Sequence, residues 1–284
     1  MAQFRVWLPV AFGDSYTRIV FKYLDQGRWS LSRAEWSLAF EAFDLLGDAL
    51  IDTPDGLQHF KALYESQIEA NLANRYIADL LKLDNVPGGW TPLWARYARA
   101  IFALWQRSSW LEGVGVEARL LLGYWLFWWE MFAEGYAFEV QVLEDLEQSG
   151  VAFAPHDLRT RQGRRSPYDL AVLGLHGDIK TSLYFLQHGR SPGMRRDFYI
   201  SRFRYRGREK VMIVLMQPLA WQKIDGEAER ATWEQLKAEL PTVASILHRG
   251  RQIVVVDYET WKARVRRRQQ QEEGNERANA PWDK

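Results

Sequence analysis

The period of the hydrophobic pattern changes near residue 150, and this change limits the folds open to the chain. Before it, apolar residues recur at helical spacing in four long segments: 31–50, 53–83, 91–111 and 115–148. After it, short runs rich in β-branched and aromatic residues are typical of strands: 151–155, 168–174, 176–183, 197–205, 209–217 and 251–258. Helical patterns return at 228–239 and 258–271. This order predicts an α/β or α+β fold with a mixed sheet.

Local signals mark the ends of the predicted helices. Ser32 followed by Glu35 is a capping-box pattern at a helix start. Thr53 and Thr91 each precede a proline, so we expect further helices to begin at these threonines. Residues 86–90, VPGGW, are expected to form the turn between those two helices.

The composition narrows the compartment and the class of protein. The chain has no cysteine, which excludes disulfides and thiolate-bound zinc and favours a cytoplasmic, intracellular protein. No signal peptide is recognisable in the first ten residues. The most apolar run, 120–129, is too short to span a bilayer, so we expect a buried helix and no membrane association. Ten of the fourteen tryptophans precede residue 130, and at helical spacing they favour a packed core.

The charge is unevenly distributed along the chain. Residues 1–150 carry 12 Lys and Arg against 20 Asp and Glu, a local net charge of −8. Residues 151–210 carry 13 basic against 5 acidic residues, a local net charge of +8. A basic segment that also contains paired acids favours a polyanionic partner together with a cation.

Residues 166–182, SPYDLAVLGLHGDIKTS, place three charged groups in an apolar, strand-like stretch. A turn at 173–174 puts Asp169 opposite Asp178, with Cβ atoms roughly 4.5–5.5 Å apart on one face. Lys180 shares that face because side chains alternate along a strand. Two like charges facing each other destabilise a hairpin, so we expect a compensating divalent cation. Hard oxygen ligands favour Mg²⁺ or Mn²⁺.

The preceding helix supplies a third acid. An apolar stripe has a gap at Glu139; its members are Phe132, Tyr136, Leu143 and Leu146. A carboxylate in a buried stripe is costly unless it is paired or bound to a metal, which favours Glu139 as a site residue. Three other acids of the helix are predicted on its polar side with Gln141: Glu130, Glu134 and Asp145.

These residues resemble the PD-(D/E)xK nuclease superfamily. Glu139, the Pro167-Tyr168-Asp169 run and the Asp178-Ile179-Lys180 run match its pattern of a helix acid, a strand acid and acid-x-lysine. The resemblance covers roughly residues 115–265. It implies a helical N-terminal module followed by a restriction-endonuclease-like αβββαβ core with a mixed sheet.

The resemblance also implies metal-assisted hydrolysis of phosphodiester bonds. Asp169, Asp178 and the main-chain carbonyl of Ile179 would hold Mg²⁺ or Mn²⁺, with Glu139 as a direct or water-mediated ligand. Lys180 would orient the attacking water, help to deprotonate it and stabilise the charge that develops on phosphorus.

Basic residues flank the hairpin on both sides. Guanidinium groups suit phosphate oxygens and would give affinity that is independent of base sequence. The predicted nucleic-acid contacts are Arg159, Arg161, Arg164, Arg165, Arg195, Arg196, Arg202 and Arg204. A solvated sheet face is the alternative for these arginines. His176 shares the acidic face, either toward substrate or bonded to a neighbour, whereas His59, His156, His188 and His248 show no ligand spacing.

We therefore expect three parts: an acidic, tryptophan-rich helical module (1–114), a nuclease domain (115–265), and a basic then polar, disordered tail (266–284). The substrate would be nucleic acid, DNA rather than RNA, and the helical module would select substrate or bind a protein partner. Cleavage of both strands would require a homodimer. Two alternatives stay open: a nuclease-fold binding or scaffolding module without hydrolysis, and an unrelated α/β domain whose acids and lysine form a structural ion-pair cluster.

Overall fold

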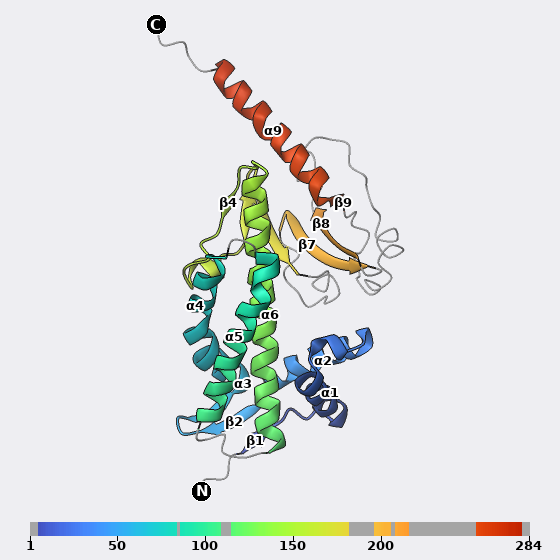
Figure 1. Cartoon of the computed structure of the whole chain (residues 1–284), viewed down its shortest axis with the longest axis vertical. Helices are drawn as coiled ribbons and strands as arrows, with labels where there is room; N and C mark the ends of the chain where they lie inside the picture. Colours follow the sequence, from blue (N-terminus) through green and yellow to red (C-terminus); the bar gives the residue numbers. More distant parts are fainter. Residues whose placement is uncertain are drawn as a thin grey trace. The chain divides into compact units, whose positions relative to one another are not determined.

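The long helix α6 (Val116–Gln148) belongs to two compact units, Met1–Glu134 and Gly135–Lys284. The computed structural model describes residues 5–83, 86–108, 115–181, 196–205, 208–215 and 254–279. The boundary lies inside α6, twenty residues after the predicted boundary at 114. The reason is that the first part of α6 packs with the preceding helices, whereas Phe138, Val142 and Leu146 belong to the core of the sheet (Figure 1).

The first unit is mainly helical. Its elements are β1 (Val6–Trp7), α1 (Asp14–Gln26), a 3-10 turn (Arg28–Ser30), α2 (Arg33–Gly47), β2 (Leu50–Thr53), β3 (Gly56–His59), α3 (Phe60–Leu63), a π-helical turn (Tyr64–Glu69), α4 (Ala70–Leu80) and α5 (Val86–Arg107). The three strands form one small antiparallel sheet. Tryptophan and other aromatic residues fill the core as predicted, with Phe127 of α6 stacked on Phe43 at 4.1 Å between ring centroids.

One of the predicted helix starts is confirmed and two are wrong. The Ser32 side chain accepts the Glu35 N–H, and the Glu35 carboxylate accepts the Ser32 N–H, so the capping box is present. Thr53 instead ends β2: its hydroxyl bonds to Gly56, and a turn leads directly into β3. Helix α5 begins at Val86 and contains Pro92, so residues 86–90 are its first turns and not a connecting turn.

The second unit contains a six-stranded mixed sheet of order β4-β5-β6-β7-β8-β9. The strands are β4 (Ala154–Pro155), β5 (Leu170–Val172), β6 (Leu175–Lys180), β7 (Phe198–Tyr205), β8 (Arg208–Leu215) and β9 (Val254–Asp257), so every predicted strand is confirmed. Strands β6 and β7 pair in parallel and the other neighbours pair antiparallel. The predicted mixed α/β architecture is therefore confirmed, while the helix predicted at 228–239 lies outside the described residues.

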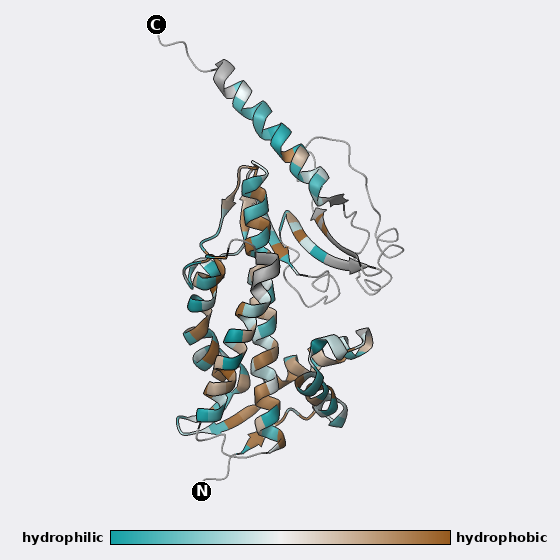
Figure 2. Cartoon of the chain, in the orientation of Figure 1, coloured by the Kyte–Doolittle hydropathy of each residue, from teal (hydrophilic) through white to brown (hydrophobic). Residues whose placement is uncertain are grey.

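Helix α9 (Tyr258–Asn279) corrects the predicted disordered tail. Its first turns join the core of the sheet through Trp261 and Val265. The remainder is hydrophilic (Figure 2), yet it continues as a helix because Glu, Gln and Arg are good helix formers. Arg268 and Glu272 add an i,i+4 ion pair at 3.1 Å, and the Gln269 side chain bonds both backbone groups of Ala152.

Candidate metal centre on the β5–β6 hairpin

The hairpin of β5 and β6 has the predicted register. Leu170 pairs with Gly177, Ala171 with His176 and Val172 with Leu175, so the next pair of positions along the strands is Asp169 and Asp178. Leu173 and Gly174 form the turn with φ of 51° and 72°, the left-handed conformation that a two-residue hairpin requires.

Asp169 is fixed by backbone contacts at the end of β5. Its N–H donates to the Gly177 carbonyl at 3.0 Å, and its Oδ2 accepts the Ile179 N–H at 2.7 Å. The carboxylate thus takes a role that a backbone carbonyl has in a regular ladder. This bond orients Asp169 without filling the remaining lone pairs of the carboxylate.

Asp178 and Lys180 lie on the more exposed face of β6, and the side chain of Ile179 between them is buried, as the alternation predicted. Lys180 Nζ is 3.2 Å from one Asp178 oxygen, and Arg196 Nε is 3.2 Å from the other. Asp178 therefore has two cationic partners of its own, and one of them is a predicted nucleic-acid contact. The role of the Ile179 carbonyl as a metal ligand stays a prediction.

Glu139 of α6 is buried, with 7% of its surface exposed. The stripe that led to this prediction is only partly correct: the residues of α6 that join the core of the sheet are Phe138, Val142 and Leu146, and two of them lie one position before Glu139 and Leu143 of the predicted stripe. Glu139 lies beside these residues at the edge of the core. It contacts His156 Nε2 through Oε1.

His156 is the site residue that the sequence analysis missed. Strand β4 pairs with β5 through Ala154–Ala171 and Pro155–Leu170, so the next position, His156, is opposite Asp169. Its N–H donates to the Asp169 carbonyl at 2.9 Å. The strand predicted at 151–155 ends directly before His156, but its sequence does not specify which strand it pairs with.

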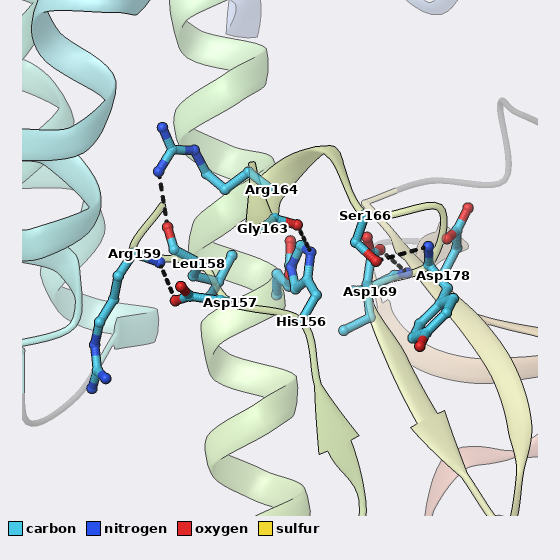
Figure 3. Close-up of polar contacts among 12 residues, drawn as sticks. His156, Asp157, Leu158, Arg159, Gly163, Arg164, Ser166, Asp169 and Asp178 are labelled. Atoms are coloured by element: carbon cyan, nitrogen blue, oxygen red, sulfur yellow. Dashed lines mark hydrogen bonds and ion pairs between the residues drawn. The ribbon is translucent and has the colours of Figure 1, made fainter. Parts of the chain in front are cut away.

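The loop after His156 holds the imidazole in place (Figure 3). His156 Nδ1 lies 3.1 Å from the Gly163 carbonyl, and Gly163 approaches Asp157 so closely that a Cβ atom would be 2.0 Å from its carbonyl oxygen. In the tautomer protonated at Nδ1, His156 donates to Gly163, and the lone pair of Nε2 faces Glu139. Metal-binding histidines are commonly oriented through the second nitrogen in this way.

One ligand atom each from Glu139, His156 and Asp169 lie within 4.8 Å of one another. Two carboxylates and an imidazole are a suitable donor set for a divalent cation, and the nitrogen ligand suits Mn²⁺ and other transition metals better than Mg²⁺. The set differs from the predicted one because His156 is present, while Asp178 is bonded to Lys180 and Arg196.

The electrostatics of this cluster favour a cation. Burial and the nearby charge of Asp169 raise the pKa of Glu139 to about 7, although His156 acts in the opposite direction. Burial also raises the pKa of Asp169, where the repulsion from Asp178 adds to the shift and the attraction of Lys180 reduces it. Burial alone would lower the pKa of His156, but the Glu139 carboxylate outweighs it and the pKa is raised. Both carboxylates are therefore harder to ionise than exposed ones, and a bound cation would offset this cost.

The predicted arginine contacts fall into three groups. Arg159, Arg161 and Arg165 are exposed on the loop before the hairpin. Arg164, Arg196 and Arg202 are bonded within the unit: Arg164 to the Leu158 carbonyl, Arg196 to Asp178, and Arg202 to Gln141 while lying over the Phe138 ring. Arg195 and the side chain of Arg204 lie outside the described residues.

His176 stacks on Tyr168, with ring centroids 4.1 Å apart, on the exposed face of β6.

Comparison with protein-family models, with curated proteins and with solved structures returned no match. Among the described residues, no helix is both long enough and apolar enough to cross a bilayer.

Proposed function

We propose that the second unit is a metal-dependent nuclease that hydrolyses phosphodiester bonds of nucleic acid, with DNA favoured over RNA. The observation that carries the proposal is the convergence of Glu139, His156 and Asp169 beside a hairpin that also presents Lys180. The resemblance to the PD-(D/E)xK pattern, with its restriction-endonuclease-like core, supports the same chemistry.

Glu139, His156 and Asp169 would hold the divalent cation, Mg²⁺ or Mn²⁺. When bound, such an ion supplies Lewis acidity toward a phosphodiester oxygen. Asp178 holds Lys180 on the partly exposed face of β6 through the 3.2 Å ion pair. There Lys180 would orient the attacking water and stabilise the charge that develops as the new P–O bond forms and the bond to the leaving oxygen breaks.

The exposed loop arginines would bind the substrate backbone. Arg159, Arg161 and Arg165 have their guanidinium groups in solvent, on the loop that also holds His156. Contacts of this kind position a phosphate chain but do not read bases, so we expect affinity that decreases steeply with salt.

A cleavage assay tests the proposal. Supercoiled plasmid, linear duplex, single-stranded DNA and RNA are incubated with Mg²⁺, Mn²⁺ or EDTA. Wild type is expected to cut in the presence of metal, and Lys180→Ala is expected to lose roughly 10²–10⁴-fold in rate while its fold and binding are kept. Lys61→Ala, an exposed lysine in the first unit, is the matched control.

Full activity of Lys180→Ala would overturn the assignment of this residue. Salt-sensitive binding without cleavage of any substrate would instead identify a nuclease-fold module that binds nucleic acid without hydrolysing it. Loss of fold in Asp169→Ala would favour a structural ion-pair cluster.

A further inference from the structure

The first unit contains a cavity of about 430 Å³, within the size range of small-molecule sites. It is formed by the end of α1 and the following 3-10 turn, one face of α5, and α6. The lining residues that carry the argument are Arg28, Trp29, Trp94, Arg99, Phe102 and Glu130.

The walls of the cavity are aromatic. Trp94 and Phe102 are eight residues apart on one face of α5, and Trp29 comes from the 3-10 turn. Trp29 is 70% exposed and Phe102 is 41% exposed, although aromatic side chains of this size are usually covered. Flat apolar walls of this kind suit a planar aromatic ligand.

The polar end of the cavity is built around a buried carboxylate. Glu130 is 7% exposed, which corrects its predicted place on the polar side of the helix. Its Oε2 accepts a hydrogen bond from Tyr23 at 2.9 Å, and its Oε1 is 3.6 Å from Arg28. Arg28 donates hydrogen bonds from both of its terminal nitrogens to Glu134. Glu130 therefore keeps lone pairs for further N–H donors.

A cation is available at the rim. Arg99 is exposed on α5 and makes no ion pair with any residue that the structure describes. An unpaired guanidinium next to an aromatic cavity suits an anionic substituent of the ligand, and a phosphate is well matched to its planar geometry.

We propose that this cavity binds a guanine nucleotide, either free or as an unpaired residue of a nucleic-acid strand. The base stacks on Trp29, Trp94 or Phe102, and its N1–H and N2–H₂ groups donate to Glu130. The phosphate binds Arg99. Adenine is disfavoured because its corresponding edge carries an acceptor next to a donor, which would leave a carboxylate oxygen facing a lone pair.

Calorimetric titration of the full chain in EDTA tests this inference independently of any cleavage. The probes are guanosine 5′-monophosphate, adenosine 5′-monophosphate, guanosine, and short single strands with one guanine or one adenine. We expect the guanine nucleotide to bind at least roughly tenfold more tightly than the adenine nucleotide, a difference of about 1.4 kcal/mol. Tighter binding of the guanine strand than of the free nucleotide would identify a strand as the source; the reverse order would identify the free nucleotide.

Three variants locate the binding. Glu130→Gln is expected to remove the preference for guanine, and Phe102→Ala to weaken all the nucleotides. Arg99→Ala is expected to weaken the monophosphate roughly tenfold and to leave guanosine unchanged. Arg75→Ala on α4, also exposed, is the matched control for charge. No binding at about 1 mM nucleotide, equal affinity for both bases, or affinities unchanged in all three variants would overturn the inference.

Discussion

Helix α6 carries two buried glutamates nine residues apart, Glu130 in the first unit and Glu139 in the second, and they are neutralised differently. Glu130 has a hydrogen bond from Tyr23 and lies near Arg28, which is also bonded to Glu134. Glu139 contacts the imidazole of His156, and the charged residues near it include Asp169.

The difference separates a carboxylate whose charge a nearby arginine compensates from one whose bonded partner, among the described residues, is a histidine. Burial raises the pKa of Glu130, but Arg28 and Tyr23 counter it. At Glu139 burial acts together with the repulsion from Asp169, and the pKa reaches about 7. Both glutamates have a second acid nearby, Glu134 for Glu130 and Asp169 for Glu139, but among the described residues only the first pair shares an arginine. Burial beside a second acid therefore indicates a metal centre only where no arginine already pairs with both carboxylates.

The largest expected effect is on the first unit. Arg28→Ala would leave the buried Glu130 and the partly buried Glu134 without their shared cation, so we expect the free energy of unfolding to decrease by about 3–5 kcal/mol. Urea unfolding followed by tryptophan fluorescence reports on this unit, which holds most of the tryptophans. Arg119→Ala breaks an exposed pair with Asp25 and should cost no more than about 1 kcal/mol. Equal costs for the two variants would show that the buried network does not need Arg28.

In the second unit, removing a charge should not decrease the stability of the metal-free protein. Asp169→Asn removes one acid from the cluster and keeps an acceptor for Ile179, so the metal-free protein should not lose stability. Mn²⁺ at 100 times its dissociation constant should stabilise wild type by about 2.7 kcal/mol, and Asp169→Asn should abolish this gain. Thermal unfolding with Mn²⁺ and with EDTA measures both. Glu147→Gln, an exposed acid of α6, should behave as wild type, and a Mn²⁺ effect retained in Asp169→Asn would remove Asp169 from the site.

The hairpin could be predicted from the sequence because its information is local. The alternation of polar and apolar residues and the turn at 173–174 determine which residues face one another, and the structure has that register. His156 could not be found in the same way. It reaches Asp169 only through the pairing of a two-residue strand with β5, which no periodicity in so short a segment specifies.

The two glutamates illustrate the same limit on helices. A stripe of apolar residues identified the helix, but its orientation was wrong by about one residue, so Glu130 was predicted on the polar side although it is buried. The buried face of α6 is not the same in the two units, between which the helix is divided after Glu134. Only the packing partners on each side, such as Phe43 and Tyr258, determine that face.

A smaller effect distinguishes the metals. His156→Gln removes the nitrogen ligand while Glu139 and Asp169 remain, so Mn²⁺ affinity should decrease roughly tenfold and Mg²⁺ affinity should change less. Calorimetric titration of each ion measures the ratio, and His59→Gln, an exposed histidine of the first unit, is the control. An equal loss for both ions would mean that His156 orients the acids and does not contact the metal.

The smallest effect concerns Glu35, a carboxylate that is not buried, in contrast to Glu130 and Glu139. Glu35 caps α2 and bonds Lys22, and these contacts lower its pKa to about 2. A lowered pKa means that its contribution to stability is complete above the ordinary value near 4.5 and is lost as the pH decreases toward 2. Glu35→Gln keeps the cap acceptor and loses only the charge, so wild type and variant should differ slightly at pH 7 and converge near pH 2. Glu117→Gln at the start of α6 is the control, and salt should reduce the difference. A difference that persists at pH 2 would show that the cap geometry, and not the charge, is what Glu35 contributes.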